Sequence, residues 1–172
     1  MSHKKTIIAT NSSTIPLSKI GVEVKHRDRI VGSHFMFPPH IVPIVEVSRG
    51  IETTNETIDS TITLWEKCGK IPVRLEKDVP GYIVNRLQAA IQREAMYLIE
   101  IGAATPKAID TAVSSGFGLR WVTSGPVEHS DIGGLDVSMR FSEFMWPVLT
   151  NATKPFSNVR HKVKNGELGL KS

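Results

Sequence analysis

Two residues of complementary acid–base chemistry lie twelve positions apart in the stretch HFMFPPHIVPIVEV. His34 ends one apolar run, Glu46 lies inside the next, and Pro38 and Pro39 stand between them. Proline cannot continue a central ladder, so this pattern predicts that the chain turns back and that the two side chains face each other. A carboxylate that accepts a hydrogen bond from one imidazole nitrogen fixes the tautomer of the ring. The other nitrogen is then free to take a proton from a hydroxyl.

The same pair has an ordinary structural interpretation. A histidine in a strand is more often a hydrogen-bonded core residue, and Glu46 could simply face water. Spacing alone therefore leaves a catalytic and a structural role open. His40, beside the prolines, is interpreted as a loop residue. No other histidine or cysteine stands at the spacing of metal ligands, so no metal site is predicted.

A second candidate is the polar stretch ATNSST, which follows a predicted strand and opens a predicted helix. In open α/β sheets, ligands bind at the carboxyl ends of strands, where the free backbone N–H groups of a helix start also lie. Ser12, Ser13 and Thr14 are equally explained as helix caps. Taken alone, the residues favour the cap interpretation.

Strands and helices must position these residues. Before residue 79, short apolar runs alternate with two helical patterns. The predicted strands are TIIAT at 6–10, RIVGSHF at 29–35, IVEVS at 44–48 and IPVRLE at 71–76. The predicted helices cover LSKIGVEV and NETIDSTITLWEKCG. Such alternation predicts a sheet covered by helices.

After residue 79 the strand signals stop. An apolar stripe that begins at Ile83 and Leu87 predicts a long amphipathic helix ending at Gly102. Asn85 falls about 160° from Leu87 on the helical wheel, so its amide faces either solvent or a crevice. Further helices are predicted over 105–116, with Gly116 as the stop, over 138–149, and in the last stretch before a loose tail. The chain thus reads as a partial α/β unit followed by an all-helical unit.

Composition narrows the class of protein. The chain has 172 residues, 40% apolar and 22% charged, which is typical of a globular protein. No apolar run approaches the roughly 20 residues of a membrane span. The net charge of +4 is scattered, and its densest cluster is interrupted by Asp28, so neither nucleic acid nor membrane is an expected partner. A single cysteine, Cys68, suits a cytoplasmic location.

In order and spacing, four stretches resemble the 3-hydroxyacyl-CoA dehydrogenase family across essentially all of the chain. They are TNSSTI, GSHFMFPP–PIVEV, GKIPVRLEKDVPGYIVNRLQAAIQREAMYLIEIG and GFGLRWVTSGPVEHSDIGGLDV. The resemblance implies a truncated Rossmann-like sheet of late strands over residues 1–79. Residues 80–172 would then form a helical domain for substrate binding and dimerisation.

The family's chemistry is a reversible oxidation in which NAD takes a hydride from a 3-hydroxyacyl thioester, which would place the protein in fatty-acid β-oxidation. The resemblance implies that His34 is the catalytic base and Glu46 its paired carboxylate. Ser13 would match the serine near nicotinamide and substrate. Asn85 would match the asparagine that helps to hold the substrate, and Lys171 a lysine near the cofactor in the family's C-terminal tail.

The chain departs from the family pattern at two points. Phe37 occupies a position where the family usually has asparagine, and losing that amide would leave any buried partner unsatisfied at a cost of about 1–3 kcal/mol. A dinucleotide fold also needs a glycine-rich turn, and residues 1–172 contain no G-x-G-x-x-G. The chain therefore resembles a dehydrogenase without its front half. We predict weak or absent NAD binding by this chain alone.

The leading hypothesis is an NAD-dependent 3-hydroxyacyl-CoA dehydrogenase, or the C-terminal portion of one, acting on an acyl-CoA substrate. The branch that oxidises free hydroxy acids, such as L-gulonate or carnitine, is a close alternative. A non-catalytic helical dimerisation or acyl-binding module is the other. The expected partners are a second copy, through the helix from Pro80 to Ile101, and a separate chain that completes the truncated sheet.

Overall fold

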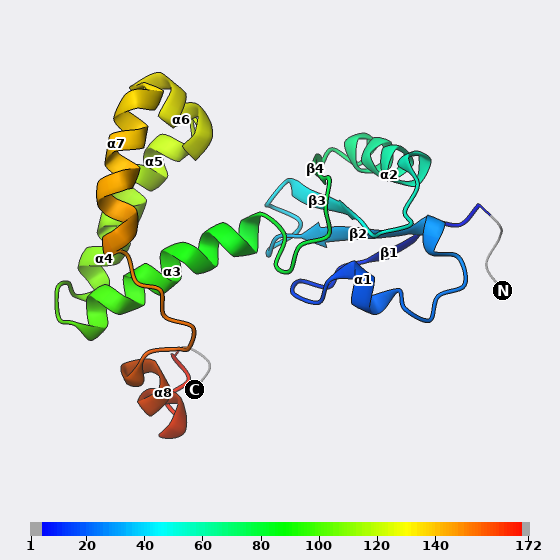
Figure 1. Ribbon diagram of the computed structural model, residues 1–172. Helices are drawn as coiled ribbons and strands as arrows, with labels where there is room; N and C mark the ends of the chain where they lie inside the picture. The colour runs from blue at the N-terminus through cyan, green and yellow to red at the C-terminus, as the bar shows by residue number, and fades with distance from the viewer. Residues whose placement is uncertain (1–4, 170–172) are drawn as a thin grey trace. The chain divides into compact units, whose positions relative to one another are not determined.

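The computed structural model describes residues 5 to 169, which divide into two compact units, one up to Gln88 and one from Ala89 onward (Figure 1). The first unit is built on a four-stranded sheet in the order β1-β2-β3-β4. Its strands are β1 (Ile8–Thr10), β2 (Ile30–Phe35), β3 (Ile44–Arg49) and β4 (Ile71–Leu75). Its helices are α1 (Leu17–Ile20) and α2 (Asn55–Lys67), with a short 3-10 turn at Arg27–Arg29. The predicted α/β unit is confirmed.

The strands pair in two directions. β1 runs parallel to β2, and β3 runs parallel to β4, whereas β2 and β3 are antiparallel. The reversal between β2 and β3 contains the two prolines that predicted it, and the bond between Phe37 and Pro38 is cis. β1 and β4 are the two edges of the described sheet.

The two faces of the sheet carry different residues. Val31, Val45 and Val47 are fully buried on one face, where they pack with Ile58 of α2. Because side chains alternate along a strand, the residues between them point to the other face. Those residues are Gly32, His34, Glu46 and Ser48. The acid–base pair therefore lies on the face opposite α2.

Helix α2 is fixed by its start and by side-chain bonds to the sheet, which include an ion pair between Arg74 of β4 and Asp59 at 2.9 Å. The Thr54 hydroxyl accepts a hydrogen bond from Thr57 N at 3.2 Å, which caps the first turn. The Trp65 indole N–H donates to Ser33 Oγ at 3.1 Å. Gly69, with φ +72°, follows the last turn as a glycine stop should.

The second unit is helical, and the predicted all-α half is confirmed. Its elements are α3 (Val84–Glu100), which begins before the division, then α4 (Pro106–Ala112), α5 (Gly118–Trp121), α6 (Pro126–Gly133), α7 (Leu135–Met145) and α8 (Ser157–Lys164). Gly116 is not the clean stop predicted. A π-helical turn over Val113–Phe117 joins α4 to α5, and Gly116 forms the kink inside it. Helices α5 and α6 were not predicted, because both are short and begin at Gly or Pro.

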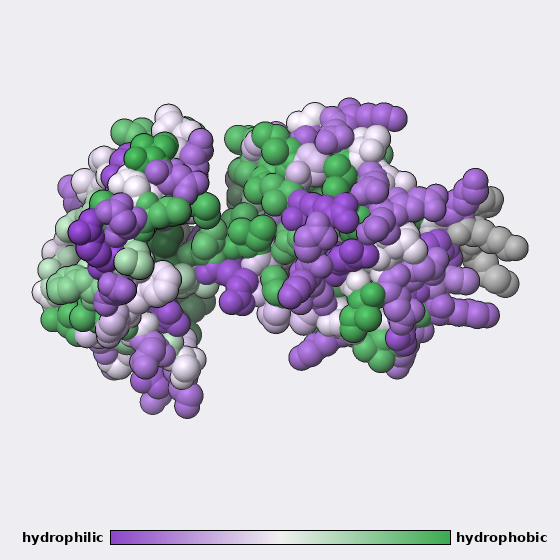
Figure 2. Space-filling view, turned by 45° about the horizontal axis from the view of Figure 1, so that its top comes forward, coloured by the Kyte–Doolittle hydropathy of each residue, from purple (hydrophilic) through white to green (hydrophobic). Residues whose placement is uncertain are grey.

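None of the described residues after Tyr82 is buried. Large apolar side chains instead stay open to solvent in the helical unit, including Phe144 at 74% exposure and Trp146 at 71%. Figure 2 shows hydrophobic residues at the surface of this unit. No helix within residues 5–169 is both long enough and apolar enough to cross a bilayer.

Candidate active site

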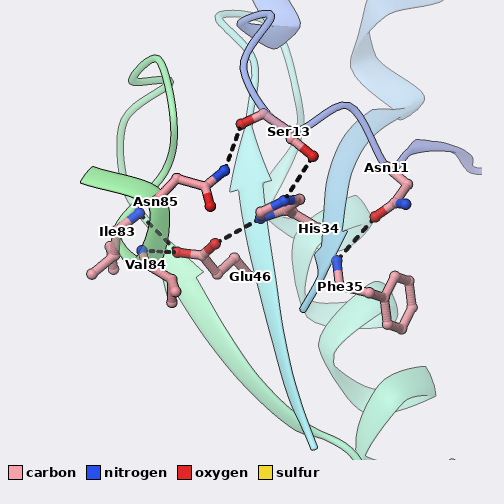
Figure 3. A network of polar contacts seen from close by, with 8 residues as sticks. All are labelled: Asn11, Ser13, His34, Phe35, Glu46, Ile83, Val84 and Asn85. Atoms are coloured by element: carbon pink, nitrogen blue, oxygen red, sulfur yellow. Dashed lines mark hydrogen bonds and ion pairs between the residues drawn. The ribbon is translucent and has the colours of Figure 1, made fainter. Parts of the chain in front are cut away.

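His34 and Glu46 are direct partners in the antiparallel register of β2 and β3. Directly opposed residues in such a ladder project from the same face, which brings their side chains together. The His34 Nδ1 atom lies 2.8 Å from Glu46 Oε2, and both side chains are buried, at 3% and 0% exposure. The sequence expectation that these side chains meet across a reversed chain is observed (Figure 3).

The second oxygen of Glu46 binds the start of α3. Oε1 accepts hydrogen bonds from Ile83 N at 2.7 Å and Val84 N at 2.9 Å. These N–H groups at a helix start lack intrahelical partners, and the positive end of the helix dipole favours a carboxylate there. Both oxygens of the buried Glu46 carboxylate therefore accept hydrogen bonds.

The contacts of Glu46 assign the tautomer of the neutral His34 ring. An ionised carboxylate only accepts, so Nδ1 carries the proton and Nε2 is the acceptor. Nε2 lies 3.2 Å from Ser13 Oγ, and the serine hydroxyl donates to it. Ser13 is exposed, so this nitrogen faces the accessible side of the site. The arrangement presents a base whose proton-accepting atom points outward.

Two amide side chains hold the loop after β1 in place. Asn85 Nδ2 donates to the Ser13 carbonyl at 3.1 Å, so the amide reaches the site instead of solvent. Asn11 Oδ1 accepts from Phe35 N at 3.0 Å, which ties the loop to the end of β2 (Figure 3). Sequence reasoning missed Asn11. Its position directly after a strand in ATNSST is the signal that could have identified it.

The cap interpretation of Ser12, Ser13 and Thr14 is wrong. Helix α1 starts after Pro16 without a capping bond from a neighbouring side chain. Its free N–H groups donate instead to Asp78, from Leu17 N at 3.1 Å and from Ser18 N at 2.8 Å. A carboxylate from a distant part of the chain leaves the Ser13 hydroxyl available for His34.

Tyr82 is a further site residue that the sequence did not single out. Its ring stacks on the His34 imidazole, with centroids 4.8 Å apart and planes inclined by 10°. The side chain is 2% exposed. Burial raises the pKa of the Tyr82 phenol, and the negative charges of Asp78 and Glu46 raise it further.

The other candidates have simpler outcomes. Phe37 is 91% exposed, so within residues 5–169 its side chain occupies no buried position, and an effect of the missing amide on cofactor or substrate placement stays a prediction. Lys171 lies outside the described residues. Within residues 5–169, no group of three or more His, Cys, Asp or Glu side chains could hold a metal ion.

The site fits one end of a dinucleotide. Ser13 and Asn11 follow β1, at the carboxyl edge of a parallel strand pair, where α/β sheets place the cofactor. The exposed Ser13 hydroxyl beside His34 Nε2 is chemically suited to the nicotinamide end. The glycine-rich turn that carries a pyrophosphate has no counterpart in residues 1–172.

Comparison with known proteins agrees with this geometry. Residues 1–79 match the family model of the 3-hydroxyacyl-CoA dehydrogenase NAD binding domain, and residues 81–172 match that of the C-terminal domain. The chain belongs to the 3-hydroxyacyl-CoA dehydrogenase family, whose members are oxidoreductases that use NAD. The resemblance seen in the sequence is confirmed.

Relatives in this family differ in their named substrates. The chain is 36% identical over 97% of its length to the 5-formyl-3-hydroxy-2-methylpyridine 4-carboxylate 5-dehydrogenase of Mesorhizobium japonicum. It is 35% identical over 97% of its length to a probable 3-hydroxybutyryl-CoA dehydrogenase of Bacillus subtilis. It is 37% identical over 71% of its length to an L-carnitine dehydrogenase of Streptomyces griseus. The chain spans 54%, 57% and 36% of these relatives.

A solved structure agrees with the fold. The crystal structure of a 5-formyl-3-hydroxy-2-methylpyridine 4-carboxylic acid 5-dehydrogenase, an NAD⁺-dependent dismutase, superposes with a TM-score of 0.94 at 36% identity. The match covers 97% of this chain and 54% of that one.

Proposed function

We propose that this chain supplies the acid–base half of an NAD-dependent dehydrogenase that oxidises a 3-hydroxyacyl-CoA to its 3-ketoacyl-CoA. The observation that carries the proposal is the orientation of His34, with Nδ1 held by Glu46 and Nε2 directed at the Ser13 hydroxyl. NAD, when bound, accepts the hydride from the hydroxyl-bearing carbon. His34 Nε2 takes the hydroxyl proton, which leaves a ketone.

The other residues act on this proton transfer. Glu46 stabilises the imidazolium that forms, because its charge lies against the protonated Nδ1. The second N–H of the Asn85 amide provides a donor for the substrate oxygen, and the Ser13 hydroxyl provides another once the substrate hydroxyl replaces it at Nε2. On the family resemblance alone, we propose that Ser13 and Lys171 bind the cofactor. On the same basis we propose a domain boundary after residue 79.

A hydride-transfer assay with acetoacetyl-CoA and NADH tests the proposal. It is run on the chain alone and on the chain with a neighbouring gene product that supplies the front half of the fold. We expect His34→Asn to lower kcat by about 100- to 10,000-fold. His40→Asn, in the exposed turn after β2, is the matched control and should retain full activity. Equal rates in both variants, or no activity in either arm, would refute the proposal.

A second candidate substrate class is a small free carboxylate that carries an alcohol or aldehyde. The similarity to the pyridine-carboxylate enzyme extends over nearly the whole chain, and Phe37 is an exposed aromatic three residues beyond His34. A panel of 3-hydroxybutyryl-CoA, L-carnitine, L-gulonate and a hydroxymethylpyridine carboxylate separates the classes by kcat/KM. A higher kcat/KM for a free acid would replace the acyl-CoA as the proposed substrate, with His34 in the same role as base.

The chain alone should bind NAD weakly, because a dinucleotide needs a pyrophosphate cradle as well as the nicotinamide end. Isothermal calorimetry of the purified 172-residue chain tests this. Tight binding would contradict it. The exposed edge of β1 is the surface we propose for a separate chain that completes the sheet.

A further inference from the structure

Tyr82 covers one face of the His34 imidazole, whose polar contacts all lie in the plane of the ring. The two ring nitrogens fix the imidazole within its own plane, through Glu46 and Ser13. A ring can still rock about the line that joins two such contacts. The near-parallel stack at 4.8 Å places a flat, buried surface against that motion.

The backbone at Tyr82 is held in an unusual conformation. Gly81 has φ +78° and Tyr82 has φ +51°, and a bulky residue in the left-handed region is a true outlier. Immediately after this turn come the N–H groups of Ile83 and Val84 that bind Glu46. The strained turn therefore brings both the aromatic ring and the donors for the carboxylate to the His34–Glu46 pair.

The sheet is shaped to receive the ring. Gly32 precedes His34 by two positions on the same face of β2. A Cβ atom at Gly32 would lie 2.8 Å from Tyr82 Oη, which is too close, and 3.3 Å from Cε1, which is a tight contact. Glycine at this strand position thus has a packing reason, since strand interiors otherwise disfavour it.

The ring, and not the hydroxyl, is the part of Tyr82 that acts on His34. Among the described residues the buried hydroxyl has no hydrogen-bond partner. The two carboxylates beside it and its burial keep it protonated, so it brings no charge to the site. Phenylalanine would preserve the stack and remove an unsatisfied polar atom.

We propose that Tyr82 is a positioning residue that holds the plane of His34 against Glu46 and Ser13. The inference rests on the proposed function only in treating His34 as the base. Its test uses histidine-selective ¹⁵N NMR of the full chain and requires no turnover, so a failure here is distinct from a failure of the dehydrogenase assay.

Tyr82→Leu is the main variant, with Tyr82→Phe as the conservative rescue. In Tyr82→Leu we expect the His34 Nδ1 proton to exchange with water about tenfold faster, the fold-change that corresponds to a lost aromatic contact. Tyr82→Phe should exchange at the wild-type rate. Tyr97→Leu, which removes the tilted Tyr97–Phe156 pair of the helical unit, is the matched control and should not alter His34. Wild-type exchange in a folded Tyr82→Leu protein would overturn the proposal.

A second pair of variants covers the case in which Tyr82→Leu does not fold. Gly32→Ala should accelerate exchange at His34 by pushing on Tyr82 Oη. Adding Tyr82→Phe removes the atom at 2.8 Å and should restore part of the protection. An identical disturbance in Gly32→Ala with and without Tyr82→Phe would show that the ring does not transmit it, and would overturn the inference.

Discussion

The carboxylate of Glu46 accepts hydrogen bonds at both oxygens, and the two sets of donors belong to different parts of the first unit. Oε2 meets His34 on the neighbouring strand, whereas Oε1 meets the first N–H groups of α3. A fully buried charge is costly unless its hydrogen bonds are complete. One side chain thus orients the proposed base and anchors a helix to the sheet.

Replacing Glu46 with glutamine should break one of these two sets of contacts. The NH2 group of the introduced amide would face either the His34 Nδ1–H or the Ile83 N–H. Two hydrogen-bond donors would then face each other in one buried contact. We expect the free energy of unfolding to fall by about 2 kcal/mol, the value of hydrogen bonds to a charged group. Urea denaturation measures this, and ¹⁵N shifts report the His34 tautomer. Glu66→Gln, at an exposed position of α2, is the control and should leave the free energy of unfolding unchanged. An unchanged stability would contradict the dual role.

Replacement of Phe37, in contrast to that of Glu46, is expected to leave the stability of the protein nearly unchanged. Because its side chain is 91% exposed, Phe37→Asn should change the free energy of unfolding by no more than about 0.5 kcal/mol. Any functional effect should appear in the KM or in the ranking of substrates, since position 37 follows the strand that carries His34. Thermal unfolding and the substrate panel measure the two effects. A large loss of stability would show that the ring packs in solution.

At the scale of elements, three helices begin at carboxylates that are remote in sequence. Asp78 binds the start of α1, Glu46 that of α3, and Glu100 that of α8. Capping rules look for the acceptor of the first helical N–H groups among the residues directly before the helix. Those rules therefore placed the serines of ATNSST as caps, although the acceptor for α1 comes from sixty residues later.

Glu100 gives this capping a pH dependence. The Ser157 hydroxyl and the Asn158 N–H donate to its carboxylate and hold the pKa of Glu100 below its ordinary value of 4.5. A folded pKa lower than the unfolded one means that the stabilisation is complete above 4.5 and is lost as the pH falls through the folded pKa. Glu100→Gln should therefore weaken α8 at neutral pH and make no difference in strong acid.

Amide exchange in α8, followed from neutral to acid pH, measures the effect. Glu143→Gln on the exposed surface of α7 is the matched control, for which α8 protection should equal wild type at every pH. A constant difference between wild type and Glu100→Gln across the pH range would show that the carboxylate charge does not contribute.

At the scale of the whole molecule, the helical unit lacks the buried interior that normally stabilises a domain. No described side chain after Tyr82 is buried, although α3 and α7 both have amphipathic sequences. Exposed apolar area of this kind on helices marks an association surface. We propose that a second copy covers it, through α3 as the sequence suggested and also through α7.

Sedimentation equilibrium of the chain should therefore show a dimer. Phe144→Glu on α7 should shift it toward monomer, because a charge would be buried in the interface without a partner. Ile51→Glu, at an even more exposed apolar position in the first unit, should leave the dimer intact. A wild-type protein that stays monomeric at high concentration would contradict the proposed association through α3 and α7.

Local patterns predicted the strands, the long helices and the meeting of His34 with Glu46, because alternation and a proline turn fix register over short separations. They also placed Asn85 near the start of α3. They could not supply Tyr82, whose role depends on a contact across the sheet face, and they missed Asn11 although its place directly after a strand was a usable signal. Short helices such as α6 and the kink at Gly116 were missed because they span too few residues for a periodic apolar pattern to identify them.

Because Glu46 both orients His34 and holds the start of α3, its retention in related sequences would have a structural cause as well as a catalytic one. A lineage in which the proposed catalysis were lost would still be selected to retain that glutamate, because its loss would remove the bonds that hold the start of α3 to the sheet. The Ser13 side chain anchors no helix, since its hydroxyl contacts His34 Nε2 and the bond from Asn85 goes to the backbone carbonyl, which any residue would keep. Drift away from an enzyme would thus first be visible as the loss of that serine.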